Sequence, residues 1–390
     1  MKNIKKLYSL FFMFFIFSYN SLGQNPIIAN LVNEVSGDSI FNHISYLQEF
    51  ERNSITEDNE ARDFICNYLK KNEFDTIFYQ YYNDGWLPNI VAVKYGNTNL
   101  DSIYVLGAHY DSYSISPGAD DNASGTSSVL EISKVLSKIV FKNTIMFVLF
   151  SGEENGLVGS NAFVDSMIMK SNNIKGMVNL DMISYSRDSN NIFVTICVNS
   201  FSKNIMNTYI KSISKYTPNL PFRIDSTSML INNSDHKPFW NKNIAAIFLT
   251  KETDFNSNNF NPYYHKETDI LGMSSNSKVQ TELISKSVLA TITELLEFST
   301  LKTYNLEKSK YNINFFPNPF SQTAKLEFEN KNNETYQLQI TDITGKLLQS
   351  QQSKSNVMII EKGNMPSGMY FYKLQNSLTK ESYNGKFVVE

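Results

Sequence analysis

Cysteine and histidine are scarce in this sequence of 390 residues, which contains two cysteines and four histidines. Two cysteines cannot build the disulfide framework of a small extracellular domain. Cys66 and Cys197 each lie in an apolar run, so we expect two buried free thiols. A single bridge between them stays open as an alternative if the compartment is oxidising.

An excess of one charge is also lacking, because 35 basic residues are matched by 38 acidic residues, for a net charge of -3. Such a balance gives no electrostatic reason for binding nucleic acid or an anionic membrane surface. We therefore expect no nucleic-acid partner. Hydrophobic residues make up 42% of the chain, which is enough for a large buried core.

Long apolar runs are missing except at the N-terminus. Lysines precede apolar residues 7–17 there, and the small residues of Ser21-Leu22-Gly23 follow. A positively charged N-terminal segment, a short apolar segment and a cleavage site with small residues are typical of a secretory signal peptide. A transmembrane anchor would need about 20 apolar residues, and this run is shorter. We predict a signal peptide at 1–23, a secreted mature chain from about Gln24, and no stable membrane span.

Residues 24–300 alternate between segments typical of strands and of helices. Uninterrupted apolar runs, which suit strands buried on both faces of a parallel sheet, occur at 89–93, 103–108, 144–150, 177–180, 192–198 and 244–249. Helical patterns occur at 60–71, 124–139, 156–169, 203–216 and 278–298. The alternation predicts an α/β domain with a mostly parallel central sheet flanked by helices. In such sheets the ligand site lies beyond the carboxyl ends of the strands.

The composition changes after residue 300. Polar residues 301–312 are typical of a linker, and residues 313–390 contain short alternating segments separated by turn signals. The predicted strands are 325–329, 336–341, 346–351, 357–361, 369–375 and 385–389. This pattern predicts a small C-terminal all-β sandwich. The segment has no histidine or cysteine, so we expect an accessory domain without a catalytic site.

Acidic and histidine side chains gather where predicted strands end or where a helix begins. These positions are His109, Asp121, Glu153-Glu154, Asp181 and His265. Each has a simple explanation by itself, as a helix cap, a solvated first-turn pair, a turn residue or a core histidine. Together they would place two of only four histidines and four acids along one sheet edge by chance. We therefore interpret them as one site.

The residue types in this set favour a pair of metal ions. Two imidazoles with carboxylates and no thiolate suit zinc or a similar divalent metal. Two metal ions about 3.5–4 Å apart can share one bridging carboxylate. One bridging acid, with one histidine and one acid for each metal, accounts for all of the ligands. We predict two Zn²⁺ ions per chain at these positions.

These segments resemble the co-catalytic zinc aminopeptidase superfamily, which includes bacterial leucyl aminopeptidases, glutamate carboxypeptidase II and glutaminyl cyclases. The matching motifs are His-Tyr-Asp at 109–111, Gly-Ala-Asp-Asp-Asn-Ala-Ser-Gly at 118–125, Gly-Glu-Glu-Asn-Gly-Leu-Val-Gly-Ser at 152–160 and Asn-Leu-Asp-Met at 179–182. The resemblance implies the zinc exopeptidase fold over roughly 41–298. It places His109 and Asp181 on one zinc and Glu154 and His265 on the other. Asp121 would bridge them, followed by a cis peptide bond to Asn122.

The same resemblance implies roles for three neighbours of the ligands. Glu153 is the expected general base, which takes a proton from the attacking water and passes it to the leaving amine. Asp111 lies on the same side of its strand as His109 and is expected to orient that imidazole. Tyr264 is expected to stabilise the oxyanion that forms during hydrolysis.

A further segment, Ser-Asp-His-Lys-Pro-Phe-Trp at 234–240, resembles a stretch that lines the cleft in this family. The family does not use its histidine as a metal ligand. We therefore expect His236 to line the cleft without binding metal. Phe239 and Trp240 are expected in the core.

Residues 313–390 resemble the C-terminal sorting domain of the type IX secretion system. The matching motifs are Phe-Pro-Asn-Pro at 316–319, Thr-Asp-Ile-Thr-Gly-Lys at 341–346, Met-Pro-Ser-Gly-Met-Tyr at 365–370 and Lys-Phe-Val-Val at 386–389. The resemblance implies the type IX machinery as a partner, export past the outer membrane, and removal of the tail. The alternative is a carbohydrate- or surface-binding module with Phe371 and Tyr372 as a sugar platform.

We predict a secreted zinc metallopeptidase, an aminopeptidase that acts on peptides with a free N-terminus. One alternative is a glutaminyl-peptide cyclotransferase, which uses a single-zinc version of the same fold. Another is a carboxypeptidase with the same metal set. A non-catalytic binding protein on this fold would have lost ligands, and this chain retains all five.

Overall fold

The protein is described from a computed structural model of the full chain. The structure describes residues 23–50, 52–53, 60–82, 85–170, 173–298, 313–330, 332–342, 346–379 and 382–390. The chain divides into two compact units, residues 1–300 and 301–390. The predicted linker and all but the last residue of the predicted signal peptide lie outside the described residues.

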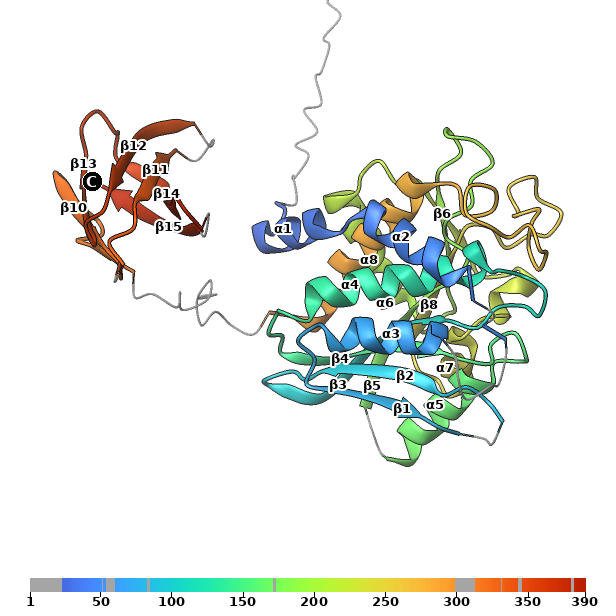
Figure 1. The fold of residues 1–390 in the computed structure, drawn as a ribbon. Coiled ribbons are helices and arrows are strands. Elements are labelled where there is room, and N and C mark those ends of the chain that lie inside the picture. Colours follow the sequence, from blue (N-terminus) through green and yellow to red (C-terminus); the bar gives the residue numbers. More distant parts are fainter. Residues whose placement is uncertain are drawn as a thin grey trace, which may run out of the picture. The chain divides into compact units, whose positions relative to one another are not determined.

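The N-terminal unit is built around an eight-stranded sheet with the order β1-β2-β4-β3-β5-β8-β6-β7 (Figure 1). The strands are β1 (Thr76–Gln80), β2 (Asn89–Lys94), β3 (Asn99–His109), β4 (Asn143–Phe150), β5 (Asn173–Leu180), β6 (Val194–Cys197), β7 (Phe222–Asp225) and β8 (Ala246–Thr250). β3 is parallel to β4 and β5, and β5 is parallel to β8. The carboxyl ends of these four central strands therefore meet at one edge. β2 runs antiparallel to β4, and β6 runs antiparallel to β8.

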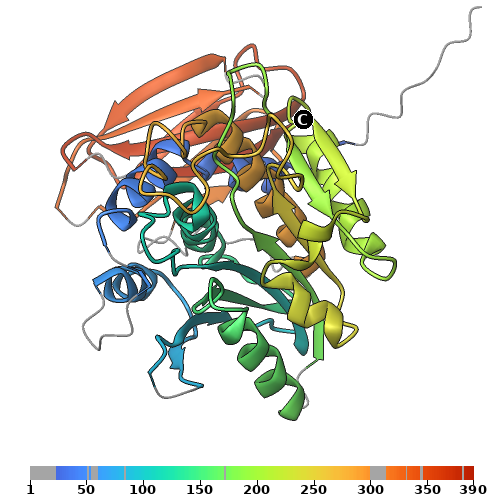
Figure 2. The ribbon, with the colours of Figure 1, turned by 90° about the vertical axis from the view of Figure 1, so that its right-hand side faces the viewer.

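Helices pack on both faces of this sheet (Figures 1 and 2). One face is covered by α3 (Glu60–Lys70), α4 (Gly125–Leu136), α6 (Lys203–Tyr216) and α8 (Lys278–Leu296), with α1 (Pro26–Glu34) and α2 (Gly37–Leu47) packed on α4 and α8. The other face is covered by α5 (Val158–Met169) and α7 (His236–Asn241). Two short irregular helices are η1 (Ala119–Ser124), which leads into α4, and η2 (Met229–Asn232).

Each face of the sheet has its own apolar core. Leu106 and Phe147 point into the core beneath α4 and α8, whereas their neighbours Val105 and Val148 point into the core beneath α5 and α7. All eight residues of β4 are buried. A central strand with two buried faces needs apolar residues at nearly every position, which is why these strands are readable as uninterrupted runs.

The predicted α/β architecture is confirmed, with element ends shifted by a few residues. The elements of the N-terminal unit absent from the prediction are α1, α2, β1, β7, η2 and α7, and β9 (Asn314–Phe316) is absent from the prediction for the C-terminal unit. The missed strands β1 and β7 pair only at the sheet edges. β1 is half-buried and β7 is mostly exposed, so neither carries an uninterrupted buried apolar run. The missed helix α7 has only six residues, too few for a helical period to be recognised.

The C-terminal unit is an all-antiparallel β structure with two sheets, ordered β13-β10-β9 and β12-β11-β14-β15. Its strands are β9 (Asn314–Phe316), β10 (Thr323–Glu327), β11 (Tyr336–Thr341), β12 (Leu347–Ser353), β13 (Val357–Glu361), β14 (Gly368–Asn376) and β15 (Ser382–Val389). Leu326, Leu338 and Phe387 lie in a core shared by both sheets. Phe371 is exposed while Tyr372 stacks on Phe315. Adjacent strand residues point to opposite faces, so these two rings do not form one sugar platform.

Both cysteines are free and buried, as expected, Cys66 in α3 and Cys197 at the end of β6. Burial raises the pKa of the Cys197 thiol well above its usual range. Within the described ranges, no helix has the length and hydropathy that a membrane span requires.

Candidate metal centre

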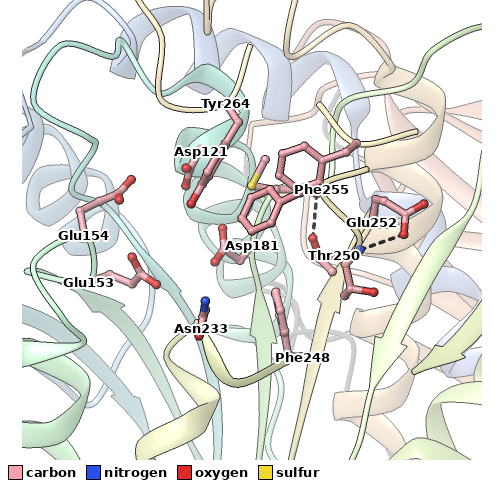
Figure 3. Close-up of a pocket in the computed structure, with 13 residues that line it drawn as sticks. Asp121, Glu153, Glu154, Asp181, Asn233, Phe248, Thr250, Glu252, Phe255 and Tyr264 are labelled. Carbon is pink, nitrogen blue, oxygen red and sulfur yellow. Dashed lines mark hydrogen bonds between the residues drawn. The ribbon is translucent and has the colours of Figure 1, made fainter. Parts of the chain in front are cut away.

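The predicted metal ligands converge at the carboxyl edge of the central strands, and Figure 3 shows three of them, Asp121, Glu154 and Asp181. His109 is the last residue of β3, Asp181 directly follows β5, and Glu154 lies in the turn after β4. Asp121 lies in η1, and His265 lies in the long loop after β8. The structure therefore brings together five residues that are widely separated in the sequence.

Two groups of side chains lie close enough to hold a metal ion. The first group is His109, Glu153 and Asp181, and the second group is Asp121, Glu154 and His265. Within each group the potential ligand atoms all lie within 4.8 Å of one another. Glu153, expected as a base and not as a ligand, thus sits beside the ligands of the first group.

Asp121 lies between the two groups. Its Oδ1 is 3.4 Å from Nε2 of His109, and its Oδ2 is 3.3 Å from Nε2 of His265. Each oxygen thus faces a different histidine. This is the arrangement that a carboxylate shared by two metal ions needs.

The loop that carries Asp121 is tied to the loop that carries His265. The carboxylate of Asp269 accepts hydrogen bonds from the backbone N–H groups of Asp120 (2.9 Å) and Asp121 (3.2 Å). The peptide bond between Asp121 and Asn122 is cis, as the resemblance implied. The Asn122 side chain then donates to the Leu180 carbonyl at 2.9 Å. The bridging position is thus anchored to strand β5 and to the His265 loop.

In the first group, Asp181 is held by a buried chain of hydrogen bonds. Its Oδ1 is 3.4 Å from Nε2 of His109. Its Oδ2 accepts a hydrogen bond from Oγ of Ser234 at 2.7 Å, and Ser234 in turn accepts one from Nδ2 of Asn179 at 2.7 Å. The contact between Ser234 and Asp181 joins residues 53 positions apart, so sequence reasoning missed it. The one feature of the sequence that pointed to Ser234 was the resemblance of residues 234–240 to a family segment near the cleft.

In the second group, Nε2 of His265 lies 3.0 Å from Oε2 of Glu154. Nε2 of His265 and Oε1 of Glu154 are buried, and neither makes a hydrogen bond with any described residue. Buried polar atoms nearly always have a partner, and both residues belong to the group whose potential ligand atoms lie within 4.8 Å of one another. Imidazole and carboxylate donors left in this way fit a divalent cation.

Asp111 connects the two groups from behind. Nδ1 of His109 is 3.1 Å from the Asp111 carbonyl oxygen and 3.5 Å from Oδ1 of the same residue. Oδ2 of Asp111 accepts the backbone N–H of Glu154 at 3.2 Å. Asp111 therefore lies where it can orient one ligand of each group.

The charges of the centre are unbalanced, because four carboxyl groups meet only two imidazoles. Burial raises the pKa of Glu153 well above its usual range, and nearby Asp181 adds to this rise against the opposing effect of His109. Burial, with the charge of Asp121, raises the pKa of Glu154 to about 8. Burial alone would lower the pKa of His265, but Asp121 and Glu154 outweigh it and raise the pKa to about 9. An excess of buried negative charge is costly unless it is compensated, and divalent cations would compensate it.

Arg52 is a buried cation behind the centre that the sequence did not single out. Its guanidinium donates to the carbonyl oxygens of Leu47, Tyr110, Pro117 and Gly118, at 2.7–2.8 Å. It therefore joins the segment after β3 to the segment before η1. Burial lowers its pKa to about 10, against the opposing effect of nearby acids, so it stays charged at neutral pH.

A pocket opens from the metal groups toward a wall of large side chains (Figure 3). The wall consists of Met182, Phe248, Phe255, Phe260 and Tyr264. Glu153, Glu154, Asp121 and Asp181 line its other side. Tyr264, predicted to stabilise the oxyanion, lines the pocket next to Asp121.

The expectation that His236 lines the cleft is wrong. His236 is fully buried, and its ring packs against Trp240 and Phe248. Nε2 of His236 lies 2.6 Å from the Ile231 carbonyl oxygen. Burial lowers its pKa to about 3, so the ring is neutral. Phe239 and Trp240 belong to the core, as expected.

Lys251, at the end of β8, is a buried cation close to this pocket. Its Nζ donates to Oε1 of Gln280 at 2.8 Å and lies 3.8 Å from the centre of the Phe193 ring. Burial lowers its pKa to about 7. The charged groups that face it are Arg223, Asp120, Glu252 and Asp188.

Known proteins share this fold and sequence pattern. A probable zinc metalloprotease of Pyrenophora tritici-repentis is 33% identical over 186 residues, 40% of this chain and 38% of that protein. Aminopeptidase YwaD of Bacillus subtilis is 31% identical over 221 residues, 55% of this chain and 47% of that protein. The chain thus spans less than half the length of these curated relatives.

Among solved structures, the LapA aminopeptidase of Legionella pneumophila superposes with a TM-score of 0.60 at 25% identity, covering 70% of this chain and 76% of that one. Residues 314–390 match the secretion system C-terminal sorting domain, which directs proteins through type IX secretion to the cell surface or beyond. Residues 89–286, which contain every predicted metal ligand, match peptidase family M28. The chain belongs to peptidase family M28, a family of zinc peptidases, and carries a type IX sorting domain at its C-terminus.

Proposed function

We propose that this protein is a dinuclear zinc aminopeptidase. His109 and Asp181 would hold one ion, Glu154 and His265 the other, and Asp121 would lie between them. The observation that carries this proposal is the position of Asp121, whose two carboxylate oxygens face different histidines at 3.4 and 3.3 Å. A site for one ion would not need a carboxylate shared in this way.

Zinc, when bound, would act as a Lewis acid that polarises the scissile carbonyl and acidifies a water molecule. Glu153 would take a proton from the attacking water and return it to the departing amine nitrogen. Burial and nearby Asp181 raise its pKa, which makes the carboxylate a stronger base toward the water. Asp111 holds the ring of His109 in place. Tyr264 donates a hydrogen bond to the oxyanion, since burial and neighbouring acids raise its pKa and keep the phenol protonated.

The wall of the pocket favours a large apolar side chain at the substrate N-terminus. Phe248, Phe255 and Phe260 would contact such a side chain and exclude water from it. Glu252 also lines the pocket, but its Oε2 is bonded to Ser257 at 2.7 Å and to Arg223 at 3.3 Å. Its charge is thus already engaged, and we expect no preference for lysine or arginine.

The deciding experiment combines metal analysis with hydrolysis of matched peptides that carry a free or an acetylated N-terminus. We expect two zinc ions per chain and cleavage of the free-amine peptides only. Cleavage of blocked peptides alone would rule out an aminopeptidase and favour a carboxypeptidase. One zinc per chain, with cyclisation of N-terminal glutamine, would favour the glutaminyl cyclase alternative.

Glu153→Gln tests the proton transfer within the same protein. The substitution keeps size and polarity but removes the base, so we expect a loss of kcat of at least about 100-fold with both zinc ions still bound. Glu34→Gln, at an exposed position of α1, is the matched control and should retain full activity. A Glu153→Gln protein that binds two zinc ions and keeps full activity would refute the mechanism.

We further propose that the predicted signal peptide and the C-terminal domain are both removed during export, which leaves a secreted catalytic domain. Deletion of residues 313–390 should abolish release to the medium while leaving hydrolysis in cell extracts intact. Release of the truncated chain at the normal level would contradict the sorting role.

A further inference from the structure

The imidazole of His265 lies between two tyrosine rings. The Tyr113 ring stacks on one face, with centroids 4.0 Å apart and planes 7° from parallel. The Tyr264 ring stacks on the imidazole with centroids 3.7 Å apart and planes at 23°. Tyr264 precedes His265 in the chain, whereas Tyr113 comes from the segment after β3. The contact with Tyr113 is therefore made only by the tertiary fold.

His265 is the least constrained of the five predicted ligands. Its side chain is 26% exposed, whereas that of Asp181, the next most exposed, is 9% exposed. It lies in a long loop and not at the end of a strand, and its backbone has a φ of 58°, in the left-handed region that non-glycine residues seldom adopt.

The second ring nitrogen of His265 also lacks the usual support. A metal-binding histidine normally donates its other ring N–H to a carboxylate or carbonyl group, which fixes the plane of the ring. His109 has such a partner in Asp111. Among the described residues, none forms a hydrogen bond with Nδ1 of His265. The contacts that this ring does make with described residues, besides those of Nε2 with Glu154 and Asp121, are its stacks with Tyr113 and Tyr264.

We propose that Tyr113 is a positioning residue for His265, and that its stacked ring fixes the imidazole plane in place of the missing hydrogen bond. This inference rests on the proposed function, in which His265 is a zinc ligand. Stacked aromatic rings resist tilting, because tilt separates their faces and exposes them to water. With Tyr264 on the imidazole as well, the ring has little freedom to turn away from the metal.

The test is the zinc affinity of each of the two sites in the full mature chain, measured by competition with a fluorescent chelator. Tyr113→Ala should lower the zinc affinity of one of the two sites by about tenfold or more. This is the range seen when a residue that supports a metal ligand is lost. The zinc affinity of the other site should change less than twofold. Tyr113→Phe keeps the ring and should bind both ions within twofold of the unaltered protein.

The matched control is Tyr95→Ala, which removes a tyrosine that is 47% exposed, against 39% for Tyr113. It should leave both affinities unchanged. Equal weakening of both sites in Tyr113→Ala, or no weakening at all, would overturn the inference. A normal thermal unfolding midpoint for Tyr113→Phe keeps the comparison valid even if the alanine variant folds poorly. An unaltered protein that binds fewer than two zinc ions would instead overturn the proposed function.

Discussion

Replacement of Ser234 by alanine tests how the first group is held. Ser234 is fully buried, and its hydroxyl is the hydrogen-bond donor to Oδ2 of Asp181. The change removes one oxygen atom and creates almost no cavity. It leaves Oδ2 of Asp181 without that donor and Nδ2 of Asn179 without its acceptor.

The expected size follows from the charge on Asp181. A hydrogen bond to an ionised group contributes about 1.5–3 kcal/mol. That range corresponds to a factor of roughly 10 to 150 in an equilibrium constant. If the bond mainly orients Asp181 for the metal, the loss appears as weaker zinc binding in the His109 and Asp181 site. If it mainly stabilises the fold, the loss appears in the free energy of unfolding of the metal-free protein.

Two measurements separate these outcomes, namely chelator competition for zinc and urea unfolding of the chelated protein. We expect the two losses together to amount to about 1.5–3 kcal/mol, with about tenfold weaker binding of one zinc ion as the larger part. Ser212→Ala is the matched control, since Ser212 is also buried and its hydroxyl has no partner among the described residues. A Ser234→Ala protein that equals the control in both measurements would refute the reasoning.

Three further predictions concern the fold around the site. Gly159→Ala should destabilise the protein by about 1–3 kcal/mol and reduce activity, because a Cβ there would collide with the Ser151 carbonyl oxygen and displace the turn that carries Glu153. Urea unfolding and peptide hydrolysis would measure these losses, and wild-type values in both would contradict the prediction. Lys251 has a folded pKa of about 7, below its usual 10.5, so the unfolded chain binds the extra proton between these values and stability gains up to about 1.4 kcal/mol per pH unit there. Lys251→Met should remove that gain, and identical slopes in urea unfolding from pH 7 to 9 would disprove it. Removal of zinc by chelation should lower the unfolding midpoint of the N-terminal unit only, by an amount equivalent to about 2.7 kcal/mol for each of the two ions where zinc had stood at 100 times its Kd. Calorimetry that shows an equal shift of the C-terminal unit would contradict this.

The sequence by itself determined the sheet and the edge at which the site lies. Strands such as β4 are buried on both faces, so their apolar runs are visible without any tertiary information. Residues that directly follow parallel strands must lie at one edge, which is why His109, Glu154 and Asp181 could be grouped from their positions alone. The antiparallel direction of β2 and β6 could not be predicted from the sequence, because a buried strand has the same apolar run whichever way it points.

Only the tertiary structure decided which atoms face one another. The two oxygens of Asp121 meet different histidines because η1 and the loop after β8 are tied together through Asp269. Ser234 reaches Asp181, and Tyr113 covers His265, across contacts between distant segments. The direction of a side chain in a loop depends on backbone angles and on packing partners far along the chain. Composition and periodicity carry no record of either, so the residues that hold the ligands in place became visible only in the folded protein.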